Sequence, residues 1–474
     1  MECDVLIIGG GVIGCAIARE LTRYNLSIAM AEAKDDVSAG ASRANSAIVH
    51  AGYDAKPGSA MARLNVLGND MYQNMCEELS VPFERIGSLV LAFGREEEKE
   101  LERLLEQGVQ NGVKNMELIS LRRALELEPQ LSREATGALW APSAGITSPY
   151  QLTIALYENA RANGLNAYFN APVTSIAFES GGFSAMAGNN VIRASYIVNA
   201  AGIYADDIAR LIGDDSFTIS PRKGEYILMD HETADIRRVL FRVPSEFGKG
   251  VLVAPTVDRN AFVGPTAKDI LDKDDTSTTY DGMRELRELG SRVVPSLDFR
   301  AQITAFSGLR AISSTGDFIL RESGRSNRFI HAAGISSPGL TAAPAIAKEI
   351  AALLNERGLP IEPNAKFNPR RAAIERFADM TPQRRAAAIK ENPQYGHVIC
   401  RCETVTEAEI AQAVHRGART LDGVKRRVRA GMGRCQGGFC APRVMEIIAR
   451  ETGMPMETIT KNGGASRLLI GKTR

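Results

Sequence analysis

Residues 4–33 of the chain read DVLIIGGGVIGCAIARELTRYNLSIAMAEA. An apolar run is followed by a glycine-rich turn, then by apolar residues at helical spacing, and then by a second apolar run. This order predicts a strand, a tight turn, a helix over Val12–Tyr24 and a second strand. Such a unit is typical of a Rossmann-type α/β fold, in which helices cover a sheet of parallel strands.

The glycines of the turn have the spacing G-x-G-x-x-G, at Gly9, Gly11 and Gly14. In such a turn the first glycine permits a sharp reversal, the second lets a pyrophosphate approach the backbone, and the third lets the helix pack closely on the strand. The start of the helix offers N–H groups and the positive end of its dipole to phosphates. Glu32, at the end of the second strand, is expected to accept hydrogen bonds from a ribose. The stretch therefore predicts a dinucleotide site.

The chain has 474 residues, of which 44% are hydrophobic and 24% charged, and its net charge is +1. These values predict a globular protein of two or three domains, without an overall charge that would attract nucleic acid or an anionic membrane. No apolar run reaches the roughly 18 residues of a spanning helix, and no export signal is visible. We therefore expect a cytoplasmic location with reduced thiols. Cys3, Cys15 and Cys76 are expected to be small packing residues.

Three later segments favour FAD as the dinucleotide. They are residues 40–72, residues 194–213 and residues 328–354, and the last two each read as a strand, a glycine-bearing loop and a helix. In the third segment, backbone N–H groups and a helix dipole would face the pyrimidine end of a flavin and favour the negative charge of its reduced form. The residues concerned are Gly334, Gly339, Leu340 and Thr341. Alternatively, all three segments are ordinary strand-to-helix turns of an α/β fold.

Together these segments resemble the glycine/D-amino-acid oxidase class of FAD-dependent oxidoreductases. Residues 45–69, NSAIVHAGYDAKPGSAMARLNVLGN, are similar to the corresponding stretch of L-2-hydroxyglutarate dehydrogenases and of the FAD subunit of anaerobic-type glycerol-3-phosphate dehydrogenases. The resemblance implies non-covalent FAD and a small anionic alcohol as substrate, with glycerol 3-phosphate first and a 2-hydroxy acid such as L-2-hydroxyglutarate second. The further candidate cofactor contacts are Ser42, Asn45, Ser46, Val173, Ala201 and Gly202.

An oxidoreductase region is expected over residues 1–363. Its FAD-binding segments are expected at about 1–80, 145–215 and 300–360, and the segments between them would form an inserted α+β substrate domain with an antiparallel or mixed sheet. Residues 148–164 read as a helix, and residues 172–188 and 224–230 as strands of the substrate sheet. Residues 249–267 read as a hairpin that turns at Asp258, Arg259 and Asn260.

Oxidation of an alcohol carbon needs a base for the hydroxyl proton, an anchor for the anionic group and a hydride acceptor. His50 is the candidate base, or else a loop histidine that only contacts the flavin ring. Arg310 stands where the resembled class places an arginine over the flavin, and its two-pronged guanidinium suits a carboxylate or phosphate; the alternative is a structural ion pair. Lys223, Tyr226 and Lys249 are further candidate pocket residues, and His331 is expected to be structural.

Four of the seven cysteines lie near the carboxyl end, in HVICRCETVTEAEI (397–410) and GMGRCQGGFCAPRV (431–444). They follow a polar, basic segment that reads as a linker over 364–397 with one or two short helices. Thr404 or Thr406 is expected to cap a helix within residues 404–417, and residues 441–453 form another. Disulfides suit neither the compartment nor Cys-x-Cys spacing, whereas a structural zinc and a [2Fe–2S] cluster each use four thiolates.

The spacing Cys-x-Cys, helix, Cys-x-x-x-x-Cys resembles the small helical domain of bacterioferritin-associated ferredoxins. The resemblance implies an all-α [2Fe–2S] domain over 398–456, followed by a tail over 457–474, with Cys400, Cys402, Cys435 and Cys440 as ligands. Nearby basic side chains would offset the negative charge of the cluster, or else form a solvated basic face or a weak nucleic-acid patch. They are Lys425, Arg426, Arg427, Arg429 and Arg434.

A flavin that accepts a hydride and a cluster that passes single electrons predict a dehydrogenase with a protein electron acceptor. That partner is expected to be a pyridine-nucleotide-linked or quinone-linked oxidoreductase subunit. No nucleic-acid partner is expected, and membrane association is expected only through the partner. Two other classes stay open, an amine or amino-acid dehydrogenase on the same fold and a scaffold protein with a non-catalytic FAD.

Overall fold

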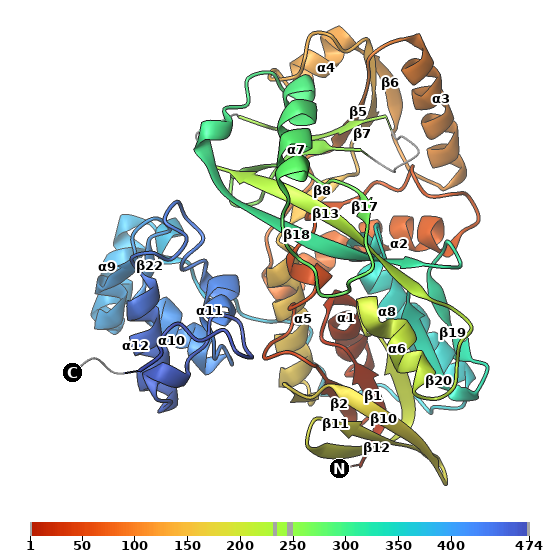
Figure 1. Ribbon diagram of the computed structural model, residues 1–474, viewed down its shortest axis with the longest axis vertical. Coiled ribbons are helices and arrows are strands. Elements are labelled where there is room, and N and C mark those ends of the chain that lie inside the picture. The colour runs from red at the N-terminus through yellow and green to blue at the C-terminus, as the bar shows by residue number, and fades with distance from the viewer. Residues whose placement is uncertain (1, 231–234, 244–249, 472–474) are drawn as a thin grey trace.

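The computed structural model describes residues 2–230, 235–243 and 250–471. Two stacked halves form a main body (residues 2–363), and the carboxyl-terminal part lies beside them (Figure 1). Lys249, one of the candidate pocket residues, lies outside the described residues. Among the described residues, no helix is long and apolar enough to cross a bilayer.

The first half contains a parallel sheet with the order β9-β2-β1-β12-β20, and β19 is antiparallel at its edge. Its strands are β1 (Glu2–Ile8), β2 (Ile28–Ala31), β9 (Asn166–Tyr168), β12 (Asn190–Asn199), β19 (Ile319–Ser323) and β20 (Ser326–Ala333). This arrangement confirms the predicted Rossmann-type fold.

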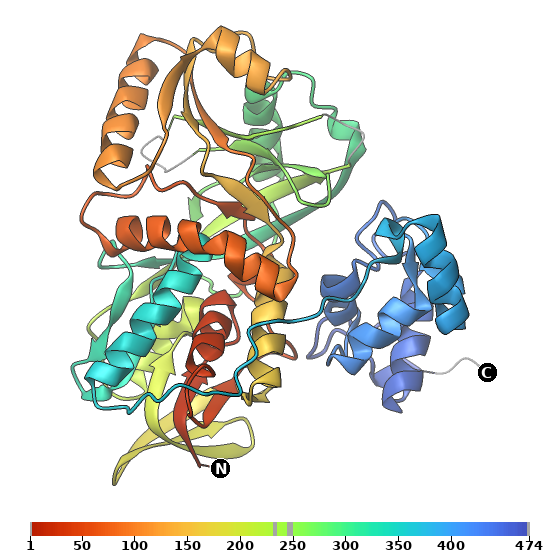
Figure 2. The ribbon, with the colours of Figure 1, turned by 180° about the vertical axis from the view of Figure 1, so that it is seen from behind.

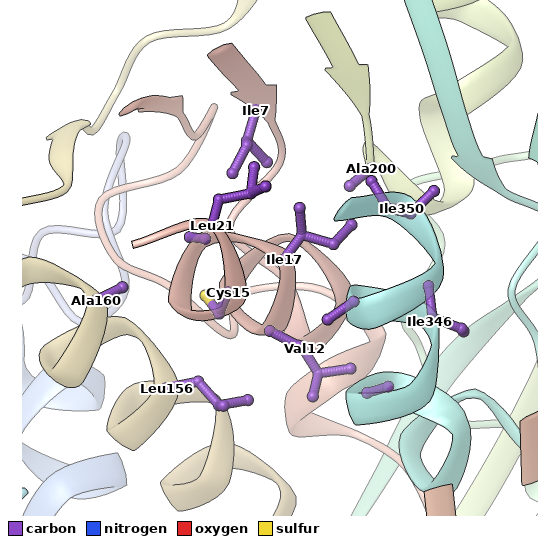
Figure 3. Packing of buried hydrophobic residues seen from close by; sticks show 14 of the residues in the cluster. Ile7, Val12, Cys15, Ile17, Leu21, Leu156, Ala160, Ala200, Ile346 and Ile350 are labelled. Atoms are coloured by element: carbon purple, nitrogen blue, oxygen red, sulfur yellow. The ribbon is translucent and has the colours of Figure 1, made fainter. Parts of the chain in front are cut away.

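Helices from distant parts of the chain cover one face of this sheet. They are α1 (Val12–Leu21), α2 (Ala60–Leu79), α5 (Pro149–Ala162) and α8 (Gly339–Glu356). Figure 3 shows α1 between α5 and α8, and apolar side chains of these helices and of β1 gather around it in one cluster. Helix α1 ends three residues earlier than predicted, because Thr22 caps it and Tyr24 forms an isolated bridge with Pro363. Cys3, Cys15 and Cys76 are buried packing residues, as expected.

One strand prediction was wrong. Residues 172–188 form β10 (Val173–Glu179) and β11 (Gly182–Ala187), but this hairpin pairs with β12 of the first sheet and not with the substrate sheet. It covers the second face of the first sheet together with α6 (Ala205–Arg210). An alternating pattern predicts a strand but does not name its neighbour.

The second half is a mixed nine-stranded sheet with the order β17-β13-β16-β15-β14-β5-β7-β6, and β18 pairs with β13 along almost all of its length. Its strands are β5 (Ser88–Ala92), β6 (Glu117–Ser120), β7 (Gly137–Ala141), β13 (Ile219–Met229), β14 (Val239–Arg242), β15 (Leu252–Pro255), β16 (Ala261–Gly264), β17 (Lys268–Asp269) and β18 (Gln302–Ser313). The predicted hairpin is confirmed, since β15 and β16 are antiparallel and Arg259 has the left-handed φ of +67° at their turn.

The remaining elements of the main body are short or lie at its outside. Helices α3 (Arg95–Gln110), α4 (Leu121–Leu127) and α7 (Tyr280–Val293) pack on the second sheet. A small sheet of β3 (Ile48–Val49), β8 (Gly145–Thr147) and β4 (Phe83–Glu84) and the 3₁₀ turns η1 (Ala41–Arg43), η2 (Gly202–Tyr204) and η3 (Phe299–Ala301) complete it.

After residue 363 the chain runs along the back of the main body before it reaches the carboxyl-terminal part (Figure 2). Backbone hydrogen bonds fix this run, from Asn364 N to Arg23 O and from Arg371 N to Glu78 O. One or two short helices were predicted here, and the segment contains one, α9 (Pro382–Glu391), between the 3₁₀ turns η4 (Phe377–Asp379) and η5 (Pro393–Gly396).

The C-terminal module (residues 398–458) is largely helical. It contains β21 (Val398–Cys400), β22 (Val405–Thr406), α10 (Glu407–His415), α11 (Leu421–Val428), α12 (Ala441–Thr452) and η6 (Met456–Thr458) around its own apolar core. Thr406 is the cap of α10 and forms a capping box with Glu409.

Candidate active site

One cavity of about 1290 Å³ lies between the two halves of the main body. Its wall begins at the glycine turn after β1, follows residues 39–46 and the ends of β2 and β12, and continues along β13, β18 and the start of α8. A single space therefore joins the predicted dinucleotide site to the predicted substrate half.

The glycine turn has no room for side chains at two positions. Gly9 has φ +110°, and a Cβ there would lie 2.4 Å from the carbonyl oxygen of Ala200. A Cβ at Gly14 would lie 2.0 Å from the oxygen of Gly9, so the absence of a side chain lets α1 pack on the turn. Gly9 and Gly11 line the cavity, whereas Gly14 does not. The turn thus has the close packing that a backbone cradle for pyrophosphate requires.

Glu32 lines the cavity at the end of β2. Its carboxylate accepts hydrogen bonds from the backbone N–H groups of Gly10 (2.6 Å) and Lys34 (2.8 Å). Burial raises the pKa of Glu32, and these two hydrogen bonds oppose the shift. The carboxylate is held at the cavity wall, where ribose hydroxyls could donate to it.

The residues predicted after β2 and β12 also reach the cavity. Ser42 Oγ accepts a hydrogen bond from Val12 N at 2.8 Å and so caps the start of α1. Asn45 Nδ2 donates to the oxygen of Ala41 at 3.0 Å and shapes this part of the wall. Residues of this predicted set that line the cavity are Ser42, Asn45, Ser46, Val173, Ala201 and Gly202.

The start of α8 closes another side of the cavity. Gly339 and Leu340 line it, while Gly334 and Thr341 lie behind the wall. Gly334 adopts the left-handed φ of +64° in the preceding loop. Thr341 is buried, and its hydroxyl accepts the backbone N–H of His50 at 2.9 Å. The N-terminal end of an eighteen-residue helix therefore borders the cavity, as expected for the pyrimidine end of a flavin.

His50 lines this cavity and also a second one of about 710 Å³. Its backbone oxygen accepts hydrogen bonds from Asn65 Nδ2 (3.3 Å) and Asn69 Nδ2 (2.9 Å). Its ring nitrogen Nε2 lies 3.3 Å from Ser337 Oγ. The histidine is thus fixed at the wall shared by two cavities, from which a proton could be passed on.

Arg310 lies on β18 and lines the same cavity as His50. Its Nη2 donates to the oxygen of Thr266 at 3.1 Å. The neighbouring Tyr226 is buried and stacks on Phe306, with ring centroids 4.8 Å apart. Burial raises the pKa of Tyr226, and the positive charge of Arg310 opposes this. A guanidinium at the cavity wall can bind an anion through paired, charge-assisted hydrogen bonds.

Two other predicted residues lie away from the cavity. Lys223 has a buried side chain whose Nζ donates to Asp275 at 2.8 Å, so it is a structural cation and not part of the cavity wall. His331 is fully buried between Phe217 and Phe329, with Nε2 3.1 Å from Asp214 Oδ2. It has the structural role that was expected.

A strap (residues 267–278) between β16 and α7 lines the cavity with Lys273, Asp274 and Thr276, and it was not predicted from the sequence. Lys273 Nζ donates to Asp206 (2.6 Å) and Asp207 (2.7 Å) of α6. The strap thereby joins the two halves of the main body across the cavity. An ion pair between residues so far apart in sequence produces no pattern among neighbouring residues, so it could not be predicted from the sequence.

The four predicted cluster ligands are arranged as two pairs in the C-terminal module. The outer pair is Cys402 and Cys435, whose sulfurs are 3.8 Å apart; Cys402 is exposed and Cys435 is half-buried. The inner pair is Cys400 and Cys440, which are hydrogen-bonded to each other and lie in the apolar core. In the described ranges, no group of three or more His, Cys, Asp or Glu side chains is placed to share one metal ion.

Each pair contains one thiol whose pKa is lower than that of an ordinary cysteine. The hydrogen bond from Cys440 lowers the pKa of Cys400 to about 6. The backbone N–H of Phe439 is the main cause that lowers the pKa of Cys435. The second thiol of each pair, Cys402 or Cys440, has a raised pKa, and the hydrogen bond to its partner contributes to the rise. A [2Fe–2S] cluster takes two cysteine thiolates on each iron, and the arrangement of the four thiols as two pairs fits that ligand set.

Several of the basic residues in and after α11 form ion pairs with the main body, which was not expected. Arg427 bonds Asp36 at 2.5 and 3.0 Å, Arg429 bonds Asp258 at 2.5 Å, and Arg434 pairs with Asp230. Burial alone would raise the pKa of Asp36, but the charges of Arg427 and Arg426 more than offset it, and the pKa falls. These arginines attach the C-terminal module to the main body. Lys425 instead donates to Gln436 in the ligand loop.

Two family models match the chain. One, described as FAD dependent oxidoreductase, matches residues 4–353, and the other, described as BFD-like [2Fe-2S] binding domain, matches residues 398–450.

Among known proteins, the chain is similar over its length to the glycerol 3-phosphate dehydrogenase of Caloramator mitchellensis, with 46% identity over 474 residues and 99% of each chain covered. The solved structure of dithionite-reduced L-alpha-glycerophosphate oxidase from Mycoplasma pneumoniae, with FAD bound, has a TM-score of 0.75 and 34% identity, covering 78% of this chain and 98% of that one. A mitochondrial L-2-hydroxyglutarate dehydrogenase of Caenorhabditis briggsae is 27% identical, over 73% of this chain and 92% of its own.

Proposed function

Because the chain belongs to the FAD-dependent oxidoreductase family and carries a BFD-like [2Fe–2S] binding domain, we propose that it oxidises glycerol 3-phosphate and passes the electrons through the cluster to a protein acceptor. The observation that carries the reaction site is the single cavity that joins the glycine turn to His50 and Arg310. The choice of substrate is supported by the full-length similarity to a glycerol 3-phosphate dehydrogenase.

In this proposal the substrate binds between Arg310 and His50. Arg310 holds the phosphate through paired hydrogen bonds, and the buried Tyr226 lies beside it at the cavity wall. His50 accepts the hydroxyl proton, and Ser337 orients its ring through Nε2. When bound, the flavin supplies the acceptor for the hydride from the alcohol carbon.

The roles of the cofactor residues are proposed in the same way. Gly9 and Gly11 hold the pyrophosphate, Glu32 holds the ribose, and Ser42 fixes the helix start beside them. The N-terminal end of α8 would contact the flavin. The four cysteines of the outer and inner thiol pairs would hold the [2Fe–2S] cluster, which would carry single electrons.

A second substrate class is supported by the similarity to L-2-hydroxyglutarate dehydrogenase, since a carboxylate suits Arg310 as well as a phosphate does. Anaerobic mixing of the FAD-loaded protein with a panel of substrates tests the choice through bleaching of the flavin absorbance. We expect rapid bleaching with L-glycerol 3-phosphate and slower bleaching, or none, with L-2-hydroxyglutarate. Bleaching by amino acids alone would replace the proposal by an amine dehydrogenase, and a flavin that no substrate reduces would indicate a scaffold protein.

A further inference from the structure

The outer thiol pair is flanked by two links to the second sheet. On one side Cys402 precedes Glu403, which bonds Arg429 Nε at 2.7 Å, and Arg429 bonds Asp258 at 2.5 Å. On the other side Cys435 follows Arg434, which pairs with Asp230. Both ligands of the outer pair are therefore one residue away from a side chain in a connection to the main body.

The two aspartates stand at the ends of strands that line the active-site cavity. Asp230 directly follows β13, which contributes Arg222 and Tyr226 to the cavity wall. Asp258 lies in the turn after β15, which contributes Leu252. Asn260 joins these strand ends, because its Nδ2 donates to the oxygen of Met229 at 3.2 Å. The same rigid strands thus border the cavity at one place and hold the ligand loops at another.

The link through Arg429 is buried and shared. The side chains of Arg429 and Asp258 are each only 7% exposed. Tyr150 OH and Asn260 Oδ1 lie 3.3 and 3.4 Å from the guanidinium, and Arg376 of the connecting segment bonds the second oxygen of Asp258 at 3.1 Å. Separating such a buried ion pair costs free energy, because each charge would be left buried without its partner. The contact between Arg429 and Asp258 therefore stays formed in the folded protein.

The first half of the main body holds the C-terminal module as well. Arg427 and Arg426 converge on Asp36, which lies in the loop after β2. Arg416 bonds Glu158 of α5 at 3.3 Å, and Thr420 Oγ1 donates to Asp35 at 3.0 Å. Contacts to both halves fix the orientation of the module, since a single contact would leave it free to pivot.

We propose that Asp258 and Asp230 are positioning residues that hold the outer pair, Cys402 and Cys435, against the second sheet, so that the module is a fixed electron outlet for the active-site cavity and not a swinging domain. The inference rests on the proposed function, in which oxidation of the alcohol to the carbonyl releases two electrons and two protons. The electrons leave singly through the cluster to a one-electron acceptor protein, two for each alcohol oxidised.

The test uses the cofactor-loaded protein and the variants Asp258→Asn and Asp230→Asn. Asparagine keeps the volume of the side chain but removes its charge, while Arg429 keeps Glu403 as a partner. Asp298→Asn is the matched control, because Asp298 pairs with Arg300 at the surface of the same half. Iron and FAD contents are measured first, and both are expected to match the wild type.

Two readouts then report the positioning. Amide hydrogen exchange in residues 429–438 should become at least about tenfold faster in Asp258→Asn, because a buried charge pair is lost. After anaerobic mixing with L-glycerol 3-phosphate, the flavin should bleach at the wild-type rate, whereas the electron paramagnetic resonance signal of the reduced cluster should appear at least about tenfold more slowly. For Arg429→Lys, the rates of hydrogen exchange and of cluster reduction should lie between those of the wild type and Asp258→Asn. Both rates of the control Asp298→Asn should equal those of the wild type.

The outcomes separate this inference from the proposed function. A wild-type protein whose cluster is never reduced after bleaching would contradict the proposed electron route, while hydrogen exchange would still report the docking. Iron-replete variants with wild-type exchange and wild-type cluster reduction would overturn the positioning role. If Asp258→Asn loses iron, Asp230→Asn decides the question, and loss of iron from both would also overturn the proposal, since the aspartates would then build the site and not position it.

Discussion

Arg310 shows what a single residue contributes when a cavity surrounds it. Its Nη2 is fixed by the oxygen of Thr266, and its charge lies beside the buried ring of Tyr226. We expect Arg310→Ala to lower kcat/KM by roughly 30- to 1000-fold, because a charge-assisted contact to a bound anion is lost. Arg310→Lys keeps the charge without the two-pronged geometry, so its kcat/KM should lie between those of the wild type and Arg310→Ala.

Stopped-flow flavin reduction at varied substrate concentration measures this effect. The FAD content of both variants serves as the control and should stay normal, because the arginine is proposed to face substrate. An Arg310→Ala enzyme with the wild-type rate and affinity would remove the anion anchor from the proposal.

His331 allows a prediction about pH. Asn199 Nδ2 lies 3.4 Å from its Nδ1, and Asp214 Oδ2 lies 3.1 Å from its Nε2, so these partners assign the proton of the neutral ring to Nε2. Burial lowers the pKa of His331, although the hydrogen bond to Asp214 opposes the shift. Below the ordinary histidine pKa of about 6.5, the unfolded chain therefore binds a proton that the folded protein does not. The free energy of unfolding consequently decreases as the pH is lowered.

The free energy of unfolding of the wild type should decrease as the pH is lowered from about 7.5 to about 5.5. His331→Gln has no titrating side chain at this position and lacks this decrease. The difference in thermal midpoint between the wild type and His331→Gln should therefore shrink as the pH is lowered over this range. A difference that stays constant would show that His331 titrates alike in both states.

At the scale of elements, the strap at residues 267–278 is expected to retain the cofactor. Its Lys273 is held by Asp206 and Asp207, and replacement by methionine should weaken this closure by about 1.5–3 kcal/mol, the value of hydrogen bonds to charged groups. FAD should then dissociate roughly 10- to 100-fold faster, by the same free-energy difference. The recovery of free flavin fluorescence after dilution measures the rate.

Lys268→Met is the matched control, because Lys268 is exposed in the same strap and does not line the cavity. It should release FAD at the wild-type rate. Equal release rates for Lys273→Met and the wild type would mean that the strap does not limit the exit of the cofactor.

Elements with a local signal could be predicted from the sequence. The glycine turn, the hairpin at Asp258–Asn260 and the cap at Thr406 each depend on neighbouring residues, and all three are present. Elements defined by distant partners could not be predicted. The β10–β11 hairpin joined the first sheet because β12 is its continuation in sequence, and Lys223 was misread because its partner Asp275 lies in the strap.

At the scale of the whole molecule, both cofactor predictions are confirmed by the family models. The role of the basic run was misjudged, because the partner of Arg427 is Asp36, 391 residues earlier in the chain. A run of arginines in sequence shows that charge is present but does not show which acid will face it after folding. The catalytic roles of His50 and Arg310 stay predictions.

Cys435→Ser tests whether the C-terminal module is separable from substrate oxidation. Because Cys435 lies in the outer pair, away from the cavity wall, its loss should abolish the cluster while FAD and flavin bleaching by substrate remain. Metal analysis should find about two irons per chain in the wild type and none in the variant. Loss of flavin bleaching together with the iron would instead show that the module supports the pocket, and stoichiometric zinc in the wild type would contradict the cluster assignment.

The separation of 3.8 Å between the sulfurs of Cys402 and Cys435 has a consequence for biosynthesis. Two accessible thiols so close together need only a small movement to form a disulfide when oxygen is present. Such a crosslink would occupy two of the four ligands and block maturation, while Cys400 and Cys440 would stay protected in the apolar core. We therefore expect newly made protein to need its iron and sulfide before it is exposed to air, and material prepared aerobically should recover its colour only after a reductant reopens the outer pair.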